Sequence, residues 1–379
     1  MNHRRALGFR VIGSAAAVVA STIGLYAAFQ VPSGKPSGSV RLAEEQFKNI
    51  QVLKGVPADQ VIPTMQFISA ALGVECEFCH VERAFDKDDK QNKKFARGMM
   101  RMTASINKDN FEGHKEVTCN TCHRGAPKPV SVPAVADENF KPPMEANAEK
   151  PPVLPNPTEV LDRYVAAIGG KAVIGKLNSL SQKGNLLAGG KQTPIEIATK
   201  APDKRISISH MPNGDNITAV DGSTGWLGSP GRPARDMNSA EADGYKLDAQ
   251  FALIPNLPRM FKEFRAVEPE KVGDRETNVL VGRRDGLPPV RLNFDKESGV
   301  LVRMTRYTET EFGRNPVQVD FSDYRDLSGV KVPYKWTLAR PSGRFTIQVD
   351  QAQANVAVDD AKFVKPATPA GTPPAGSGH

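Results

Sequence analysis

One five-residue pattern occurs twice in this chain and uses all four of its cysteines. The copies are C-E-F-C-H at residues 76–80 and C-N-T-C-H at residues 119–123. Two cysteines spaced in this way can form thioether bonds to the two vinyl groups of one haem, and the histidine that follows can supply an axial nitrogen to the iron. The two patterns therefore predict two covalently bound haem c groups. The cofactor-binding residues are Cys76, Cys79, His80, Cys119, Cys122 and His123.

Paired cysteines also occur in zinc sites and in disulfides. A four-cysteine zinc site would have to span the 39 residues between Cys79 and Cys119, more than the usual spacing, and it would leave both histidines unexplained. A disulfide within each pair would close a two-residue loop that constrains little else. Haem accounts for all six residues, with His80 and His123 as proximal iron ligands.

The first thirty residues have the features of a targeting segment. Arg4, Arg5 and Arg10 precede an apolar run over residues 11–29, as in a signal peptide or an N-terminal membrane anchor. Neither Ala27 nor Ala28 has a small residue two positions earlier, so no clean cleavage site is present and both interpretations stay open. Either one predicts a periplasmic protein, anchored in the cytoplasmic membrane by this segment or secreted after its cleavage.

Composition changes along the chain predict an α+β multidomain protein. A small, mainly α-helical dihaem cytochrome c domain is followed by an antiparallel β domain of roughly eight to ten strands, in which apolar and polar residues alternate. Asn156 and Pro157 are expected to begin a helix ahead of the strands, and Gly169-Gly170 to end it. The expected segments are 1–30 signal peptide or anchor, 31–40 linker, 41–130 cytochrome domain, 131–155 proline-rich linker, 156–365 β domain and 366–379 disordered tail.

A methionine lies at helical spacing before each motif. In the first unit Pro63 suits the first helical turn and Gly73 ends the helix. Folding this helix back over the haem would place Met65 opposite His80, where its sulfur completes six-coordinate iron.

The helix predicted before the second motif carries Phe95, Met99, Met102 and Ile106 on one face. Periodicity does not choose between Met99 and Met102 as the distal ligand. His114, five residues before Cys119, is a further candidate.

Residues 63–80 and 101–125 resemble the photosynthetic reaction-centre cytochrome c subunit family. That family builds each haem site from a methionine-bearing helix, a turn and a haem-binding helix. The resemblance covers about ninety residues and implies Met65 as the distal ligand of the first haem and Met102, rather than Met99, as that of the second. The family has four haems and a lipid-anchoring cysteine, whereas this chain has two motifs, no such cysteine and an added β domain. The resemblance therefore implies a dihaem electron-transfer unit, and the family's photosynthetic role is not carried over to this chain.

A short helix ending in Gly169-Gly170 and followed by a long meander resembles the lipoprotein-sorting carrier fold. In that fold an incomplete barrel wraps a helix and can shelter an acyl chain. The resemblance implies a half-barrel-like β domain and an apolar ligand within it.

These features favour an electron-transfer protein, and not an enzyme, that passes electrons between a donor and an acceptor protein such as other cytochromes or a membrane redox complex. The β domain would serve docking or apolar ligand binding. The alternatives are a dihaem peroxidase-like enzyme, which needs an open distal position, and an envelope lipid- or quinone-binding protein with an attached redox module. The net charge is +8, and no basic stripe with interleaved aromatics occurs in the sequence, so nucleic-acid binding is not expected.

Overall fold

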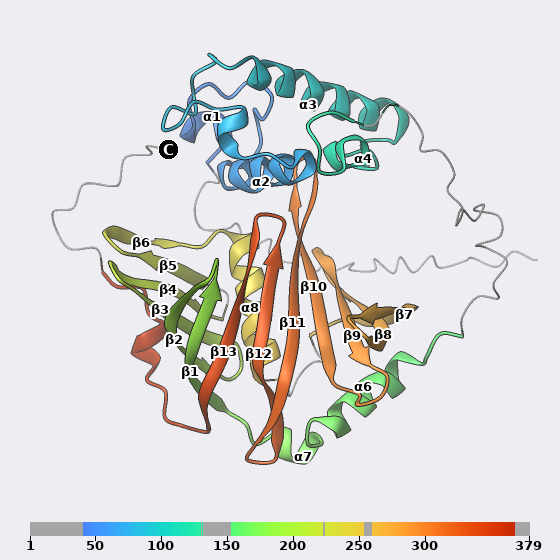
Figure 1. Ribbon diagram of the computed structural model, residues 1–379, viewed down its shortest axis with the longest axis vertical. Coiled ribbons are helices and arrows are strands. Elements are labelled where there is room, and N and C mark those ends of the chain that lie inside the picture. The colour runs from blue at the N-terminus through green and yellow to red at the C-terminus, as the bar shows by residue number, and fades with distance from the viewer. Residues whose placement is uncertain (1–40, 130, 132–152, 223, 254–259, 368–379) are drawn as a thin grey trace, which may run out of the picture. The chain divides into compact units, whose positions relative to one another are not determined.

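The computed structural model describes residues 41–129, 131, 153–222, 224–253 and 260–367 (Figure 1). The predicted targeting segment and the linker at 31–40 lie outside these residues, as do nearly all of the proline-rich linker and of the tail. Within the described part of the chain, no helix combines the length and the apolar character needed to cross a membrane.

The predicted cytochrome segment, described over residues 41–129 and called the cytochrome segment below, is helical, and a small apolar core holds its helices together. The core contains Leu53, Val61, Phe67 and Met100, each less than a tenth exposed. The elements are α1 (Ala43–Gln46), η1 (Ala58–Gln60), α2 (Val61–Leu72), η2 (Cys76–Phe78), α3 (Gln91–Asn110) and α4 (Cys119–His123).

Two expected helix ends in this segment are present. Gly73 follows the last residue of α2 with φ 65°, a left-handed conformation that suits glycine. At the other end, Pro63 lies inside the first turn of α2, where a missing N–H costs no helical hydrogen bond. Local sequence signals are therefore sufficient to place this helix.

The β domain is one open antiparallel sheet of thirteen strands. Its strands are β1 (Ser179–Ala188), β2 (Lys191–Lys200), β3 (Lys204–Met211), β4 (Gly214–Asp221), β5 (Thr224–Ser229), β6 (Arg232–Asp236), β7 (Glu263–Val272), β8 (Arg275–Arg284), β9 (Leu287–Asp295), β10 (Leu301–Thr310), β11 (Gly313–Leu327), β12 (Val330–Arg340) and β13 (Gly343–Ala354). The expected class, a small helical segment followed by an antiparallel open sheet, is confirmed. The expected number of eight to ten strands was too low, because short strands such as β6, R-P-A-R-D, have no apolar alternation.

The strand order is β6-β5-β4-β3-β2-β1-β13-β12-β11-β10-β9-β8-β7. It consists of two meanders, one from β1 to β6 and one from β7 to β13. They join only where β1 pairs with β13. The first and the last strand of the domain therefore lie side by side in the middle of the sheet (Figure 1).

Helices complete the core of the β domain. Helix α6 (Pro157–Ala167) begins as expected, with the Asn156 side chain accepting a hydrogen bond from the Thr158 amide. It buries Tyr164, whose ring packs against that of Phe294 at a centroid distance of 5.2 Å. Helix α8 (Ser239–Leu253) packs against the sheet through Leu247 and other apolar residues. The short elements α7 (Lys171–Ile174) and η4 (Asp360–Phe363) complete the described structure.

The turn between β10 and β11 contacts the cytochrome segment, which belongs to the same compact unit, Val40–His379. Phe312 in this turn is 5 % exposed and shares the apolar core of Phe67. The Asn315 side chain donates a hydrogen bond of 2.8 Å to the carbonyl of Pro63, and the ammonium of Lys115 donates one of 2.6 Å to the carbonyl of Thr310. The sheet therefore contacts α2, the helix that carries Met65.

Candidate haem sites

The first motif occupies a single turn of 3-10 helix and the residues directly after it. Within η2 the amides of Cys79 and His80 both donate to the carbonyl of Cys76, at 3.2 and 3.0 Å. Both thiols of the pair are free, and Cys76 is exposed while Cys79 is half-buried. The pair and the histidine are therefore held on one compact turn.

His80 has one ring nitrogen occupied by the backbone. Its Nδ1 lies 3.0 Å from the carbonyl oxygen of Phe85. A carbonyl oxygen only accepts, so Nδ1 carries the proton and Nε2 presents its lone pair. Burial lowers the pKa of His80 below its ordinary value, the hydrogen bond to the Phe85 carbonyl opposes this, and the positive charges of Lys93, Arg97 and Lys90 lower the pKa further. The imidazole is therefore neutral at neutral pH, which is the form that binds iron.

The second motif forms the short helix α4. The side chain of Thr118 caps it by accepting from the Thr121 amide at 3.3 Å, and the Thr121 hydroxyl accepts from the Thr118 amide at 3.0 Å. Nδ1 of His123 lies 3.0 Å from the carbonyl oxygen of Ala126. Both histidines therefore have the same arrangement, with Nδ1 donating to a nearby carbonyl and Nε2 available to a metal.

The two motifs lie in one module. The amide of Gly125, just after the second motif, donates a 2.8 Å hydrogen bond to the carbonyl of Ala71 near the end of α2. The backbones approach so closely that a Cβ on Gly73 would lie 2.2 Å from the Gly125 oxygen. The helix that carries Met65 thus ends directly on the loop after His123.

The candidate distal ligands are in different surroundings. Met65 is half-buried and packs against the apolar core of the cytochrome segment. Met99 and Met102 on α3 are each 45 % exposed, so exposure does not separate them, whereas Met100 is 7 % exposed and is part of the core. His114 is exposed in the turn that follows α3.

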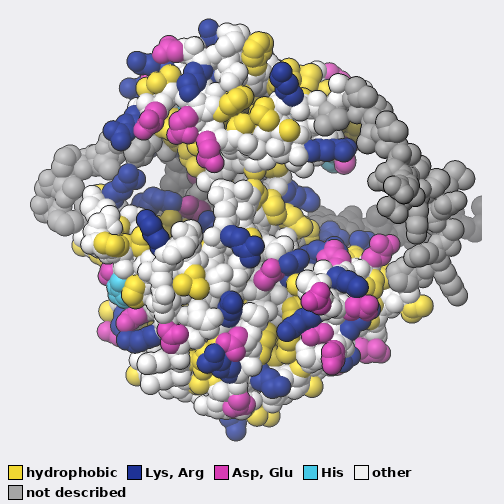
Figure 2. Space-filling model, viewed as in Figure 1, with side chains coloured by type: hydrophobic (Ala, Val, Ile, Leu, Met, Phe, Trp, Pro, Cys, Tyr) yellow, Lys and Arg dark blue, Asp and Glu magenta, His cyan; other side chains and the backbone are white. Residues whose placement is uncertain are grey.

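Hydrophobic side chains are exposed on the helical segment (Figure 2). They include Phe95, which is 62 % exposed on α3, and the two exposed methionines of the same helix. An apolar face of this kind suits contact with an apolar group such as a porphyrin ring. Among the described residues, which include all four cysteines, no three His, Cys, Asp or Glu side chains are grouped closely enough to hold a metal ion.

Sequence reasoning missed one element of the first site. Lys93 is 7 % exposed on α3, and its ammonium donates to the carbonyls of Phe85 and Lys87, each at 2.7 Å. The Phe85 carbonyl is the same one that accepts from His80. The only sequence signal was a lysine at a helical position flanked by polar residues, which is typical of a solvated surface.

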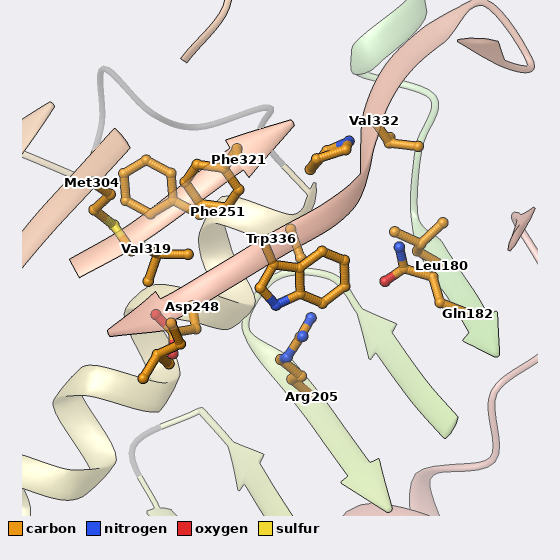
Figure 3. A pocket seen from close by; sticks show the side chains of 13 residues that line it. Leu180, Gln182, Arg205, Asp248, Phe251, Met304, Val319, Phe321, Val332 and Trp336 are labelled. Carbon is orange, nitrogen blue, oxygen red and sulfur yellow. The ribbon is translucent and has the colours of Figure 1, made fainter. Parts of the chain in front are cut away.

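The β domain contains a small cavity of about 70 Å³ beside α8 (Figure 3). The guanidinium of Arg205 lies 6.0 Å from the ring centroid of Trp336, and Asp248, which also lines the cavity, accepts a hydrogen bond of 3.1 Å from buried Arg306. A dry cavity of about 150 Å³ accommodates benzene. The cavity in this conformation is therefore too small for an acyl chain, and the apolar ligand expected in this domain stays a prediction.

Residues 4–155 match the photosynthetic reaction centre cytochrome C subunit family. Cytochrome c-554 from Chloroflexus aurantiacus is 33 % identical over 121 residues, which cover 30 % of this chain and 28 % of that protein. The photosynthetic reaction center cytochrome c subunit from Roseobacter denitrificans is 33 % identical over 124 residues, which cover 30 % of this chain and 32 % of that protein. The resemblance inferred from the motifs is confirmed, and this region is similar to c-type cytochromes of electron transfer. The chain spans about a third or less of the length of these relatives.

The sheet region is similar to solved structures at low identity. An outer membrane lipoprotein-sorting protein domain from Vibrio parahaemolyticus is 12 % identical, covers 54 % of this chain and 94 % of its own, and has a TM-score of 0.40. A LolA superfamily protein from Nitrosomonas europaea is 12 % identical, covers 55 % of this chain and 97 % of its own, and has a TM-score of 0.38.

Proposed function

We propose that this protein is a periplasmic dihaem c-type cytochrome that transfers electrons between two redox proteins. The observation that carries the proposal is the matched arrangement of His80 and His123. Each follows a pair of free cysteines, and each donates from Nδ1 to a backbone carbonyl at 3.0 Å. Metal-binding histidines usually donate their second ring nitrogen in this way, because the hydrogen bond fixes the tautomer and the ring orientation.

Each residue of the two sites has a defined role in this proposal. The cysteine pairs would hold the two haems covalently, and His80 and His123 would be the proximal iron ligands. Met65 and Met102 are the distal ligands, with Met99 and His114 as the alternatives for the second site. Haem bound at these residues would supply one-electron redox chemistry. A chain that fills both axial positions leaves the iron no place for a substrate, which favours a carrier over a peroxidase-like enzyme.

The other parts of the chain have supporting roles in the proposal. The segment 1–30 exports the chain and anchors it to the cytoplasmic membrane or is cleaved. The electron donor and acceptor are other cytochromes or a membrane redox complex. The β domain serves docking, and the contacts of Phe312 and Asn315 with α2 support this role because they connect the sheet to the haem-bearing segment.

Mass spectrometry and visible spectroscopy of the full chain, exported from cells that attach haem c, test the proposal. We expect the mass of two added haems, a low-spin spectrum and a methionine–iron charge-transfer band in the far red. The double variant Cys119→Ala/Cys122→Ala should retain one haem. A colourless protein with four titratable thiols would refute the proposal, and a high-spin ferric spectrum in the protein with two haems would favour the enzyme instead.

A further inference from the structure

A buried lysine lies behind the proximal ligand of the first site. The side chain of Lys93 is less than a tenth exposed, which is rare for lysine unless its charge is compensated. Its ammonium donates to the carbonyls of Phe85 and Lys87 and lies 3.1 Å from a carboxylate oxygen of Asp88. These contacts fix the loop that follows His80 against the first turn of α3.

One carbonyl connects this lysine to the histidine. The oxygen of Phe85 accepts from Nδ1 of His80 at 3.0 Å and from the ammonium of Lys93 at 2.7 Å. An oxygen that already accepts from a full positive charge is a weaker acceptor for the imidazole N–H. The N–H bond of His80 is then less polarised, so the imidazole donates less electron density through Nε2 to a bound iron. Weaker donation favours the ferrous state.

The charges around this carbonyl act in the same direction. The guanidinium of Arg97 lies 2.9 Å from the second carboxylate oxygen of Asp88, so one carboxylate balances two cations. The ammonium of Lys90 also lies nearby and donates to the carbonyl of Glu77. A net positive charge near a buried redox centre stabilises the state with one more electron, since charges interact strongly where water is excluded.

The second site lacks this arrangement among the described residues. His123 donates to the Ala126 carbonyl at the same distance of 3.0 Å, but no lysine or arginine nitrogen in the described part of the chain donates to that carbonyl. The two sites therefore have matched proximal hydrogen bonds and differ in the charge behind the acceptor.

We propose that Lys93 is a positioning residue for His80 and raises the reduction potential of the first haem above that of the second. This inference rests on the proposed dihaem function and goes beyond it, because it predicts which of the two haems has the higher reduction potential. Electrons would reside preferentially on the haem of the first motif. The ammonium would act through the Phe85 carbonyl and through its charge, without contact with the iron.

A spectroelectrochemical titration of the full chain with both haems attached tests this proposal. Lys93→Met keeps an unbranched side chain that is one atom shorter and removes its charge. We expect the reduction equilibrium of the first haem to become at least tenfold less favourable, which is about 59 mV for a one-electron couple. The potential of the second haem should stay unchanged. The control is Lys94→Met, the same substitution at the neighbouring, exposed residue of α3, and it should move neither potential.

A second variant keeps the test decisive if Lys93→Met lowers the yield. Asp88→Asn removes the carboxylate that compensates Lys93 and Arg97, so the potential of the first haem should rise. A purely structural role of the cluster does not predict shifts of opposite sign from the two variants. The component that belongs to the first haem is identified in the Cys119→Ala/Cys122→Ala background.

The outcomes distinguish this inference from the proposed function. A protein without two covalent haems refutes the proposed function itself. Two haems whose potentials do not change in Lys93→Met and Asp88→Asn refute only the role of Lys93, as does a shift of the same sign in both variants.

Discussion

Replacing Gly73 by alanine should weaken the contact between the end of α2 and the loop after the second motif by about 2–3 kcal/mol. Gly73 has φ 65°, and a side chain in this left-handed conformation costs roughly 1–2 kcal/mol. The new Cβ would also lie 2.2 Å from the Gly125 oxygen, so one backbone has to move. That movement weakens the hydrogen bond from the Gly125 amide to Ala71, for which about 1 kcal/mol is typical.

Gly113→Ala is the matched control. Gly113 has φ 83° and no atom within 4 Å of the position that a Cβ would take. It therefore carries the conformational cost of roughly 1–2 kcal/mol without the collision. The difference between the two variants isolates the close approach of the two backbones.

Hydrogen–deuterium exchange of the full chain measures this difference, because it reports the free energy of local opening. Peptides that cover residues 61–75 and 115–128 should exchange faster in Gly73→Ala than in the native chain. Each loss of about 1.4 kcal/mol accelerates exchange of the protected amides roughly tenfold. Equal acceleration in Gly73→Ala and Gly113→Ala would show that the approach of Gly73 to Gly125 contributes nothing.

Three further predictions concern the distal ligand, the acid stability of α8 and the β10–β11 turn. Met65→His should keep both haems attached and lower the potential of the first, and an unchanged redox titration would show that Met65 is only a core residue. Burial opposes ionisation of Glu241, but its hydrogen bonds to Arg235 and to the backbone lower its pKa below the ordinary value; the stability that it contributes is present at neutral pH and is lost as pH falls through the lowered pKa. In urea unfolding, the free energy of unfolding should therefore fall less between pH 7 and pH 3 in Glu241→Gln than in the native chain. Phe312→Ala should cost about 3–5 kcal/mol in urea unfolding, and a cost as small as that of Leu287→Ala, at a residue 42 % exposed, would contradict its role in the core.

Local signals predicted the elements whose structure depends on neighbouring residues. Asn156 and Pro157 begin α6, and Gly73 ends α2, because caps and left-handed glycines act within one helical turn. The cysteine–histidine spacing likewise predicts haem binding without tertiary information, and the site residues stay a prediction. These parts of the fold and of the candidate sites could be predicted from the sequence.

The parts that depend on distant residues could not be predicted. The strands β5 and β6 lack alternation; β5 forms because β4 supplies an edge to pair with, and β6 forms because β5 supplies the next edge. The sequence around Lys93 does not distinguish it from its neighbour Lys94. Lys93 is buried and Lys94 is exposed because the loop at residues 81–90 covers only Lys93. Likewise, Met99 and Met102 have equal exposure on α3, so only family resemblance favours Met102.

The pairing of β1 with β13 has a consequence for how this domain can be made. The strand synthesised last occupies a central position, between β1 and β12. A chain cut short before residue 343 would leave two separate ribbons, each with a new open edge that invites association with other chains. Assembly must also wait for a contact between segments far apart in the sequence, and such topologies fold slowly. The β domain therefore reaches its final form only after the chain has been synthesised past Ala354, the last residue of β13.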